Sequence, residues 1–289
     1  MRVIMNSLKQ NRAVSFAVVA LVYVFAAAVG VAVYNVLVFD WWLSLLIADA
    51  AATVATFAFS LIFKNASVYD PYWSVQPPVI LALFALGTEL TLFGVLLLCV
   101  VFFWAVRLTA NWAYTFVNLY HQDWRYTMLK EKTGVLYPLV NFVGIHMVPT
   151  LVVYGCVVPA VYAIINGLSA SLGSIIFLCV SLGAATMQGV ADIQMHRFRK
   201  NRDGAFIRSG LWRYSRHPNY LGEILMWWGV ALAVICAAPS AWYLAAGAVA
   251  NTALFLFVSI PLADGRQSRK DGFAEYKAQT RMLLPIRKG

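Results

Sequence analysis

The sequence has few charged residues and few acidic ones, and both shortages narrow the class of protein. Only 12% of its 289 residues are charged, and 12 Asp and Glu stand against 22 Lys and Arg. With 62% hydrophobic residues and a mean hydropathy of +0.73, the composition is far from that of a soluble globular domain. Disordered, collagen-like and disulfide-scaffold proteins are excluded, and an integral membrane protein is predicted.

Cysteine is also scarce, and its placement predicts no redox or metal site. The four cysteines, Cys99, Cys156, Cys179 and Cys236, all lie inside apolar segments. We interpret them as buried packing residues, because zinc sites and disulfide frameworks have characteristic cysteine spacings that are lacking here. No histidine pairs with carboxylates at ligand spacing, so no metal is predicted.

Long apolar runs predict an all-α, polytopic membrane helix bundle, because a spanning helix needs about 20 mostly apolar residues. Clear runs cover residues 14–39, 41–63, 137–164, 168–191, 219–237 and 241–262. Residues 72–106 form either one long span containing Glu89 or two short spans with Glu89 in the turn between them. A single helix would bury this carboxylate near the bilayer centre, which is costly.

The distribution of Lys and Arg favours about eight transmembrane helices. With eight spans and a cytoplasmic N-terminus, all 22 cations lie on the cytoplasmic side, whereas seven spans give 18 against 4. The positive-inside rule prefers the first arrangement. This arrangement predicts that both termini lie in the cytoplasm and that the protein resides in a bacterial inner membrane or in the endoplasmic reticulum membrane. It also explains the net charge of +10 without a nucleic-acid partner.

Ionisable and hydroxyl side chains recur on one face of the second apolar run. Asp49, Thr53, Thr56 and Ser60 are spaced by four, three and four residues, which aligns them on a helix. Thr and Ser in membrane helices often serve packing alone. Because a deep carboxylate usually faces a cavity or a partner, we expect Asp49 to line a functional cavity.

The segment that follows admits three interpretations. Asp70 before Pro71 is typical of a helix start, with the carboxylate as N-cap. Tyr72 and Trp73 also suit the aromatic belt at a membrane interface. Alternatively, Asp70 with Tyr69 and Tyr72 supplies a proton donor at the mouth of the polar face.

The strongest signal of function lies in residues 192–223. Seven cations fall between Arg197 and Arg216, and a run of Arg216, His217, Pro218, Asn219 and Tyr220 precedes Glu223. Pro218 suits the first turn of a helix, so nearby backbone amides and cations would face an anchored phosphate or carboxylate. The alternative is a basic loop that contacts anionic membrane lipids.

The stretch SRHPNYLGE, preceded by SGLWRY, resembles the C-terminal signature of the membrane superfamily that contains steroid 5-alpha-reductases, sterol reductases and isoprenylcysteine carboxyl methyltransferases. YDPYWSV, DWRY and the tail AEYKAQTRMLLP are similar to its 5-alpha-reductase-like, uncharacterised branch. The resemblance implies a seven-helix reductase-like core. Residues 1–40 are then an N-terminal tail with an additional transmembrane helix, and residues 41–289 a reductase-like membrane domain with cytoplasmic cofactor-binding loops.

The resemblance further implies NADPH as cofactor and a hydrophobic, steroid-like lipid as substrate. The family's carboxylate falls on Asp70, and Asp49, Tyr69 and Tyr72 are the other expected catalytic residues. The expected cofactor-binding residues are Arg107, Asn111, Asp192, Arg199, Arg208, Tyr214, Arg216, His217, Asn219, Tyr220, Glu223, Arg269 and Tyr276.

Two departures from the family pattern bear on the chemistry. Trp104 stands three residues before Arg107, where the reductases have a tyrosine that pairs with the carboxylate, and indole cannot donate a catalytic proton. Asp264, Arg266 and Arg269 stand where the reductases have cofactor-contacting His and Tyr residues.

Arginine-rich loops favour the phosphates of NADPH over S-adenosylmethionine, which carries a sulfonium and no phosphate. We therefore expect an NADPH-dependent oxidoreductase that reduces a conjugated C=C bond. The alternatives are an S-adenosylmethionine-dependent lipid or prenyl methyltransferase, disfavoured because the chain lacks a Glu-Glu pair, and a non-catalytic lipid-binding protein.

Overall fold

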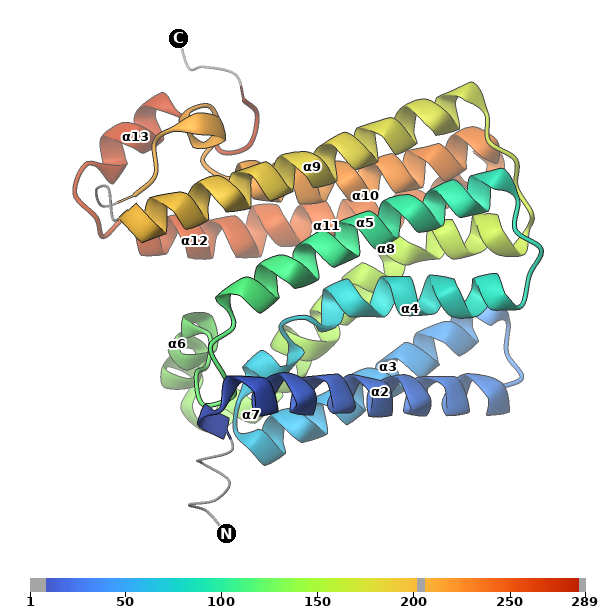
Figure 1. The fold of residues 1–289 in the computed structure, drawn as a ribbon, viewed down its shortest axis with the longest axis horizontal. Helices are drawn as coiled ribbons and strands as arrows, with labels where there is room; N and C mark the ends of the chain where they lie inside the picture. The colour runs from blue at the N-terminus through green and yellow to red at the C-terminus, as the bar shows by residue number, and fades with distance from the viewer. Residues whose placement is uncertain (1–8, 202–205, 286–289) are drawn as a thin grey trace. The chain divides into compact units, whose positions relative to one another are not determined.

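The computed structural model describes residues 9–201 and 206–285, and this part of the chain is helical apart from its connections (Figure 1). The first half contains α2 (Arg12–Val36), α3 (Trp41–Phe63), η1 (Ala66–Tyr69), α4 (Tyr72–Leu86), α5 (Leu92–Thr115), α6 (Trp124–Thr133), η2 (Gly134–Leu136) and α7 (Tyr137–Val140). The second half contains η3 (Asn141–Met147), α8 (Val148–Ile165), α9 (Leu172–Asn201), η4 (Gly210–Arg213), α10 (Pro218–Ala237), η5 (Pro239–Ala245), α11 (Ala246–Leu254), η6 (Phe255–Ser259), α12 (Ile260–Gln267) and α13 (Phe273–Gln279). The predicted all-α helix bundle is confirmed.

Seven helical segments of the described chain are long and apolar enough to cross a membrane. They are Arg12–Val36, Trp41–Phe63, Leu92–Thr115, Trp124–Ile165, Leu172–Asn201, Pro218–Ala237 and Pro239–Gln267. The predicted number of about eight is therefore corrected to seven. The remaining predicted span is present as helix α4, but its 15 residues are fewer than a typical span requires.

The ambiguous interval after Tyr72 forms two helices. α4 ends at Leu86 and α5 begins at Leu92, so Glu89 lies in the connection between them. This is the arrangement that avoids a carboxylate in the middle of an apolar helix.

The chain divides into two compact units, and the first contains the described part of residues 1–80 together with Trp112–Tyr154. Here α2 and α3 lie side by side (Figure 1). Val19 and Val22 of α2 pack with Val68 of η1, and the Tyr23 hydroxyl donates to the Val68 carbonyl oxygen at 2.7 Å. The additional N-terminal helix is thus packed into its unit.

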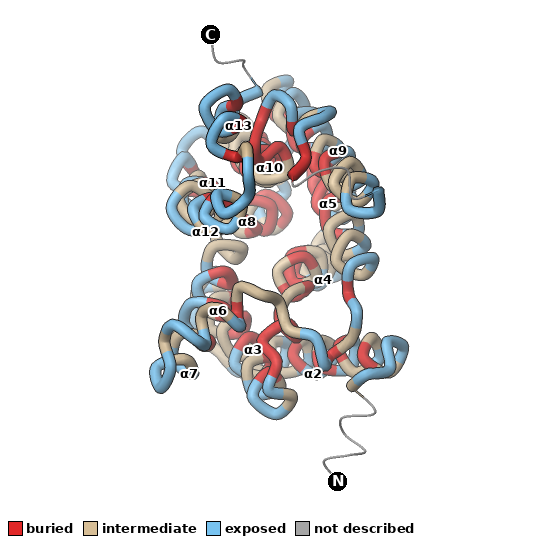
Figure 2. Tube along the Cα trace, turned by 90° about the vertical axis from the view of Figure 1, so that its left-hand side faces the viewer, coloured by how far each residue is buried: buried red, intermediate tan, exposed pale blue. Residues whose placement is uncertain are grey.

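The second unit contains Leu81–Asn111 and the described part of residues 155–289. Its α9 and α10 run side by side, and α10 is buried along most of its length (Figure 2). Gly222 and Gly229 allow this close approach: a Cβ atom on Gly222 would lie 2.4 Å from Gln188 Cγ, and one on Gly229 would lie 2.2 Å from Ser181 Oγ. Small residues spaced in this way are typical of tightly packed membrane helices.

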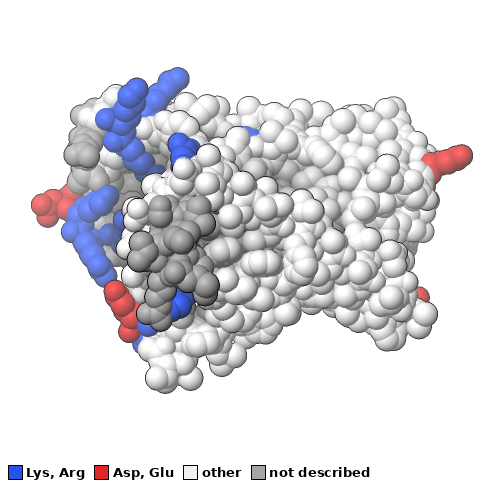
Figure 3. Space-filling view, turned by 60° about the horizontal axis from the view of Figure 1, so that its bottom comes forward, with Lys and Arg blue, Asp and Glu red and all other residues white. Residues whose placement is uncertain are grey.

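The burial of the cysteines and the placement of the charged residues both reflect a largely apolar surface. All four cysteines are free thiols: Cys156 is buried, Cys236 is half-buried, and Cys99 and Cys179 are exposed. The interpretation of all four as buried packing residues is therefore confirmed only for Cys156 and is wrong for the two exposed cysteines. An exposed thiol on an apolar helix suits contact with lipid, because cysteine behaves as a small hydrophobic residue. Figure 3 shows wide areas of surface without Lys, Arg, Asp or Glu.

Candidate functional site

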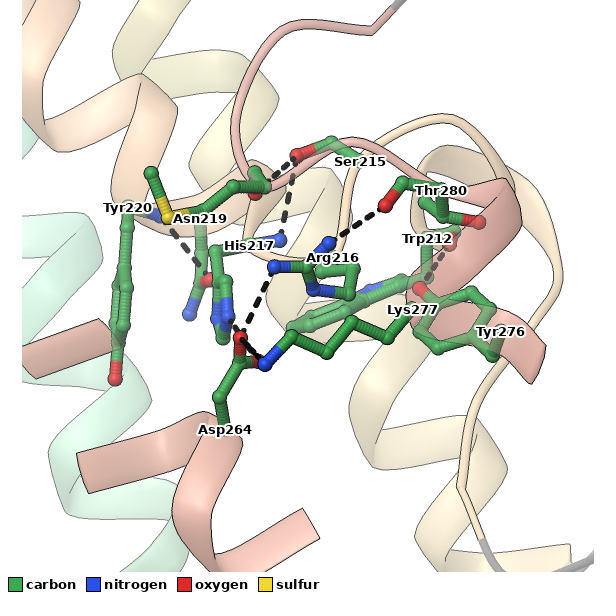
Figure 4. A network of polar contacts seen from close by, with 11 residues as sticks. Trp212, Ser215, Arg216, His217, Asn219, Tyr220, Asp264, Tyr276, Lys277 and Thr280 are labelled. Carbon is green, nitrogen blue, oxygen red and sulfur yellow. Dashed lines mark hydrogen bonds and ion pairs between the residues drawn. The ribbon is translucent and has the colours of Figure 1, made fainter. Parts of the chain in front are cut away.

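In the second unit, the start of α10 is fixed by a buried ion-pair network centred on Asp264 (Figure 4). Helix α10 begins at Pro218, as predicted, with His217 in the N-cap position. Arg216 Nη2 lies 3.0 Å from Asp264 Oδ2, and His217 Nε2 lies 2.9 Å from Asp264 Oδ1. Because α12 supplies Asp264, the network joins two helices.

The same network holds the C-terminal segment. Arg216 Nη1 donates to the Thr280 carbonyl oxygen at 2.6 Å, and the Arg216 backbone N–H donates to the Arg281 carbonyl oxygen at 3.0 Å. Lys277 Nζ lies 3.9 Å from Asp264 Oδ2. The structure therefore gives Arg216 and His217, both expected to contact a cofactor, partners within the protein.

Asp264 is the central residue of this network and was not among the expected site residues. Its sequence signal was its position directly after the apolar run 253–263, where a carboxylate needs a partner. The partners themselves lie 47 and 48 residues away along the chain, which sequence spacing cannot reveal.

Tyr276 and Arg208, both expected to bind the cofactor, make contacts with other residues of the second unit. The Tyr276 hydroxyl donates to the Trp212 carbonyl oxygen, and the Trp212 indole donates to the Ala191 carbonyl oxygen at 3.1 Å. Burial raises the pKa of Tyr276 to about 12, so it remains a neutral donor. The Arg208 guanidinium lies 4.3 Å from the centre of the Phe206 ring.

A second polar cluster joins α5, α9 and α10. Arg107 Nη1 lies 2.8 Å from Asp192 Oδ2, and Arg107 Nη2 donates to Gln188 Oε1 at 2.5 Å. Gln188 Nε2 in turn donates to Glu223 Oε2 at 2.6 Å. Asn219 lies beside Asp192. Four residues expected to bind the cofactor are thus brought together on three helices.

Glu223 accepts hydrogen bonds from two indole rings in addition to Gln188. Trp104 Nε1 donates to Glu223 Oε2 at 2.9 Å, and Trp227 Nε1 donates to Glu223 Oε1 at 2.9 Å. The two indole rings contact each other edge to face, with centroids 4.8 Å apart. The tryptophan that departs from the family pattern therefore binds a carboxylate of this chain. Sequence reasoning had noted the departure but not this partner.

One helical turn further along, Asn111 of α5 meets His196 of α9. His196 Nε2 and Asn111 Oδ1 are 2.7 Å apart. Because each lies four residues after a member of the Arg107–Asp192 pair, the two contacts lie one above the other between the same two helices. The expected residue Asn111 is therefore placed beside Arg107, and His196 is an addition to the set.

Exposed cations gather where α9 and α12 end. Burial lowers the pKa of the Lys270 ammonium, and the positive charges of Arg266 and Arg199 lower it further. The side chains of all three residues are exposed. A group of like charges favours a multiply charged anion. Arg199 was expected to bind a phosphate, whereas Lys270 was not.

The remaining expected residues of this unit are Tyr214, Arg269 and Tyr220. Tyr214 and Arg269 are exposed, and the Arg213 guanidinium lies 6.0 Å from the centre of the Tyr214 ring. The Tyr220 ring stacks on His217, with centroids 5.2 Å apart. Arg202, one of the seven clustered cations, lies outside the described residues.

In the first unit, three of the four expected catalytic residues come together. Tyr72 donates to Asp49 Oδ1 at 3.2 Å, and Gln76 Nε2 donates to Asp49 Oδ2. The Tyr69 and Tyr72 rings stack with centroids 5.1 Å apart. All four members of the polar face predicted on α3 are buried, which confirms the helical alignment. The functional cavity expected there stays a prediction.

Asp70, the fourth expected catalytic residue, has a separate partner. Helix α4 begins at Tyr72, and Asp70 Oδ1 accepts a hydrogen bond from the Tyr126 hydroxyl at 2.6 Å. Burial raises the pKa of Asp70 to about 6, against the opposing effects of Arg125 and Tyr126. Asp70 can therefore exchange a proton near neutral pH.

The comparisons with known proteins identify one family. A family described as "Protein of unknown function (DUF1295)" matches residues 56–280, and it is steroid 5-alpha-reductase-like in general terms. No curated protein and no solved structure matches the chain.

Proposed function

The chain belongs to the DUF1295 family, and we propose that it is an NADPH-dependent membrane reductase that reduces a conjugated C=C bond of a steroid-like or other hydrophobic lipid. The observation that carries this proposal is the group of exposed cations Arg199, Arg266 and Lys270 in the second unit. Their mutual repulsion is relieved when an anion with several charges binds. The pyrophosphate and 2'-phosphate of NADPH provide such an anion.

The second unit would hold the cofactor through two sets of residues. Arg199, with Arg266 and Lys270, would contact its phosphates. The network of Arg107, Asp192 and Asn219 is polar, largely satisfied and set on rigid helices, so it can orient a neutral part of the ligand. Bound NADPH supplies a hydride.

The first unit, described by itself, contains a buried acid of the kind that such a reaction needs. Hydride addition to a conjugated ketone creates negative charge on the substrate oxygen. Asp49, held by Tyr72 and Gln76, is buried among polar side chains that can stabilise such charge by hydrogen bonding. Water is largely excluded around it, because Asp49 is only 5% exposed.

A thermal-shift titration of the purified protein in mild detergent tests this proposal. NADPH should stabilise the protein saturably, because a ligand that binds only the folded state raises its stability by mass action. NADPH should raise the melting temperature more than NADH does if cations of the protein bind the 2'-phosphate, which NADH lacks. Arg199→Ala should weaken NADPH binding about tenfold, the effect of losing one charged hydrogen bond.

Arg197→Ala is the matched control, because it removes the same charge from an exposed position two residues away on α9. It should leave the NADPH affinity nearly unchanged. Equal weakening by both variants would indicate non-specific attraction and contradict the assigned site. Stabilisation by S-adenosylmethionine alone would favour the methyltransferase, and stabilisation by neither cofactor would favour a lipid-binding protein.

A further inference from the structure

Two cations of the first unit bind carbonyl groups at the C-terminal ends of helices. Lys9 precedes α2, and its ammonium group donates to the carbonyl oxygen of Phe63, the last residue of α3. Arg12 Nη2 donates to the Ala113 carbonyl oxygen, at 2.8 Å, in the last turn of α5. The last four carbonyl groups of a helix have no partner within it, so a cation is favourable there. The start of α2 and the ends of α3 and α5 therefore meet at one end of this unit.

A third cation, Lys64, follows α3 directly, and its side chain is exposed. Burial lowers the pKa of the Lys9 ammonium group, and the positive charge of Lys64 lowers it further. The two ammonium groups thus lie within electrostatic range of each other. Among the described residues, no carboxylate forms an ion pair with Lys9, Arg12 or Lys64.

The helix ends do not neutralise these three cations. The C-terminus of a helix carries a partial charge of about −0.5 elementary charge. Two helix ends together balance about one cation, so roughly two positive charges remain at this end of the unit. An anion is therefore the ligand that this group of cations favours.

The position of the three cations matches the surface of a membrane. Both α2 and α3 are long and apolar enough to cross a bilayer. Arg12 is the first residue of α2, and Lys64 directly follows the last residue of α3. A cation at the end of a spanning helix lies at the level of the lipid headgroups, where phosphate groups are abundant.

An aromatic cluster beside the cations indicates the same depth. The Phe116 ring contacts the rings of Phe16 and Trp112, with centroids 5.0 and 4.7 Å apart. The Arg12 guanidinium lies 5.5 Å from the centre of the Phe16 ring. Tyr114, which follows in the same segment as Trp112, is 69% exposed. Tryptophan and tyrosine are enriched where the apolar core of a membrane meets the headgroups.

We propose that Lys9, Arg12 and Lys64 form a binding site for the phosphate group of an anionic membrane lipid. The site lies within the first unit alone, and its function goes beyond the proposed reduction. It should prefer a lipid with a net negative charge, such as phosphatidylglycerol. Phosphatidylcholine should bind more weakly, because its own quaternary ammonium balances the charge of its phosphate.

Native mass spectrometry of the full chain in mild detergent tests this site by measuring the dissociation constant of the first bound lipid. Phosphatidylglycerol should bind more tightly than phosphatidylcholine with the same acyl chains. Lys64→Gln should weaken the binding of phosphatidylglycerol about fivefold, because one lysine near anionic lipid contributes about 1 kcal/mol. Lys64→Arg keeps the charge and should keep the affinity.

Lys132→Gln is the matched control, because it removes the same charge from an exposed position on α6 of the same unit. It should leave the affinity for phosphatidylglycerol nearly unchanged. Equal affinities for the two lipids, or equal weakening by Lys64→Gln and Lys132→Gln, would overturn the site. Millimolar inorganic phosphate should leave the lipid bound, and its displacement of phosphatidylglycerol would overturn the assignment to a lipid.

Discussion

At the scale of single residues, Glu223 shows how a carboxylate is accommodated inside an apolar helix. Three neutral donors, the indoles of Trp104 and Trp227 and the amide of Gln188, satisfy its two oxygens. Hydrogen bonds to a charged acceptor are about twice as strong as neutral ones. Trp104 therefore has a role in this chain that a tyrosine or phenylalanine side chain could not fill in the same way.

Trp104→Phe is expected to lower the free energy of unfolding by about 1 to 3 kcal/mol. The ring is kept in large part, but the Glu223 carboxylate loses one donor while it stays partly buried. Thermal denaturation of the purified protein measures the loss. Trp242→Phe is the control, because Trp242 is 71% exposed and should tolerate the change. An equal effect of both variants would contradict the hydrogen-bond explanation.

At the scale of elements, most helix positions follow from hydropathy alone. The predicted run 41–63 coincides with α3. The predicted run 219–237 ends with α10 and begins one residue after the first residue of that helix. The run 137–164 was predicted as one span, and the structure divides it into α7, the π-helix η3 and α8. A π-helix is a local change from i→i+4 to i→i+5 hydrogen bonding within a helical run, so apolar periodicity does not reveal it.

The Asp264 network is an interaction between elements, and it carries a prediction at that scale. Asp264→Asn should lower the free energy of unfolding by about 3 kcal/mol or more, because Arg216 is left buried without its counter-ion. It should also loosen the C-terminal segment, which Arg216 holds through Thr280.

Limited proteolysis and thermal denaturation together measure this effect. Cleavage should become faster in the segment around α13. Asp271→Asn is the matched control, since Asp271 is exposed in the adjacent connection. Resistance to protease equal to that of the wild type would show that the backbone contacts of Ser215 and Arg216 are sufficient to hold the segment.

At the scale of the whole molecule, stability depends on pH through opposing effects. Acid protonates carboxylates and adds to a net charge that is already +10, which favours unfolding. Asp70 acts in the opposite direction, because burial raises the pKa of its carboxyl group in the folded protein to about 6, above the ordinary value of 3.8. The folded state therefore binds more protons than the unfolded state between about pH 4 and pH 6.

The contribution of Asp70 to stability should accordingly fall as pH rises through this window. Asp70→Asn removes the titration and keeps an oxygen that can accept from Tyr126. Relative to this variant, the wild type should be similarly stable near pH 4 and less stable by about 1 to 3 kcal/mol at pH 7. Thermal denaturation of both proteins over the pH range measures the difference, and a constant difference would contradict the raised pKa.

The sequence by itself determined the class of the protein, the position of most helices and which residues are chemically unusual. These are local properties, because an apolar run or a carboxylate inside it is visible without knowing what lies opposite. Asp49, Asp192, Pro218 and Glu223 were identified on this basis.

Only the tertiary structure decided the partners. Asp264 meets Arg216, Trp104 meets Glu223 and Thr53 meets Thr150 across distances of 48, 119 and 97 residues along the chain. These pairings depend on which helix faces pack together, and small residues such as Gly222 help to set that packing. Hydropathy places each helix in the membrane, but it is nearly the same on every apolar face, so it cannot specify which faces meet.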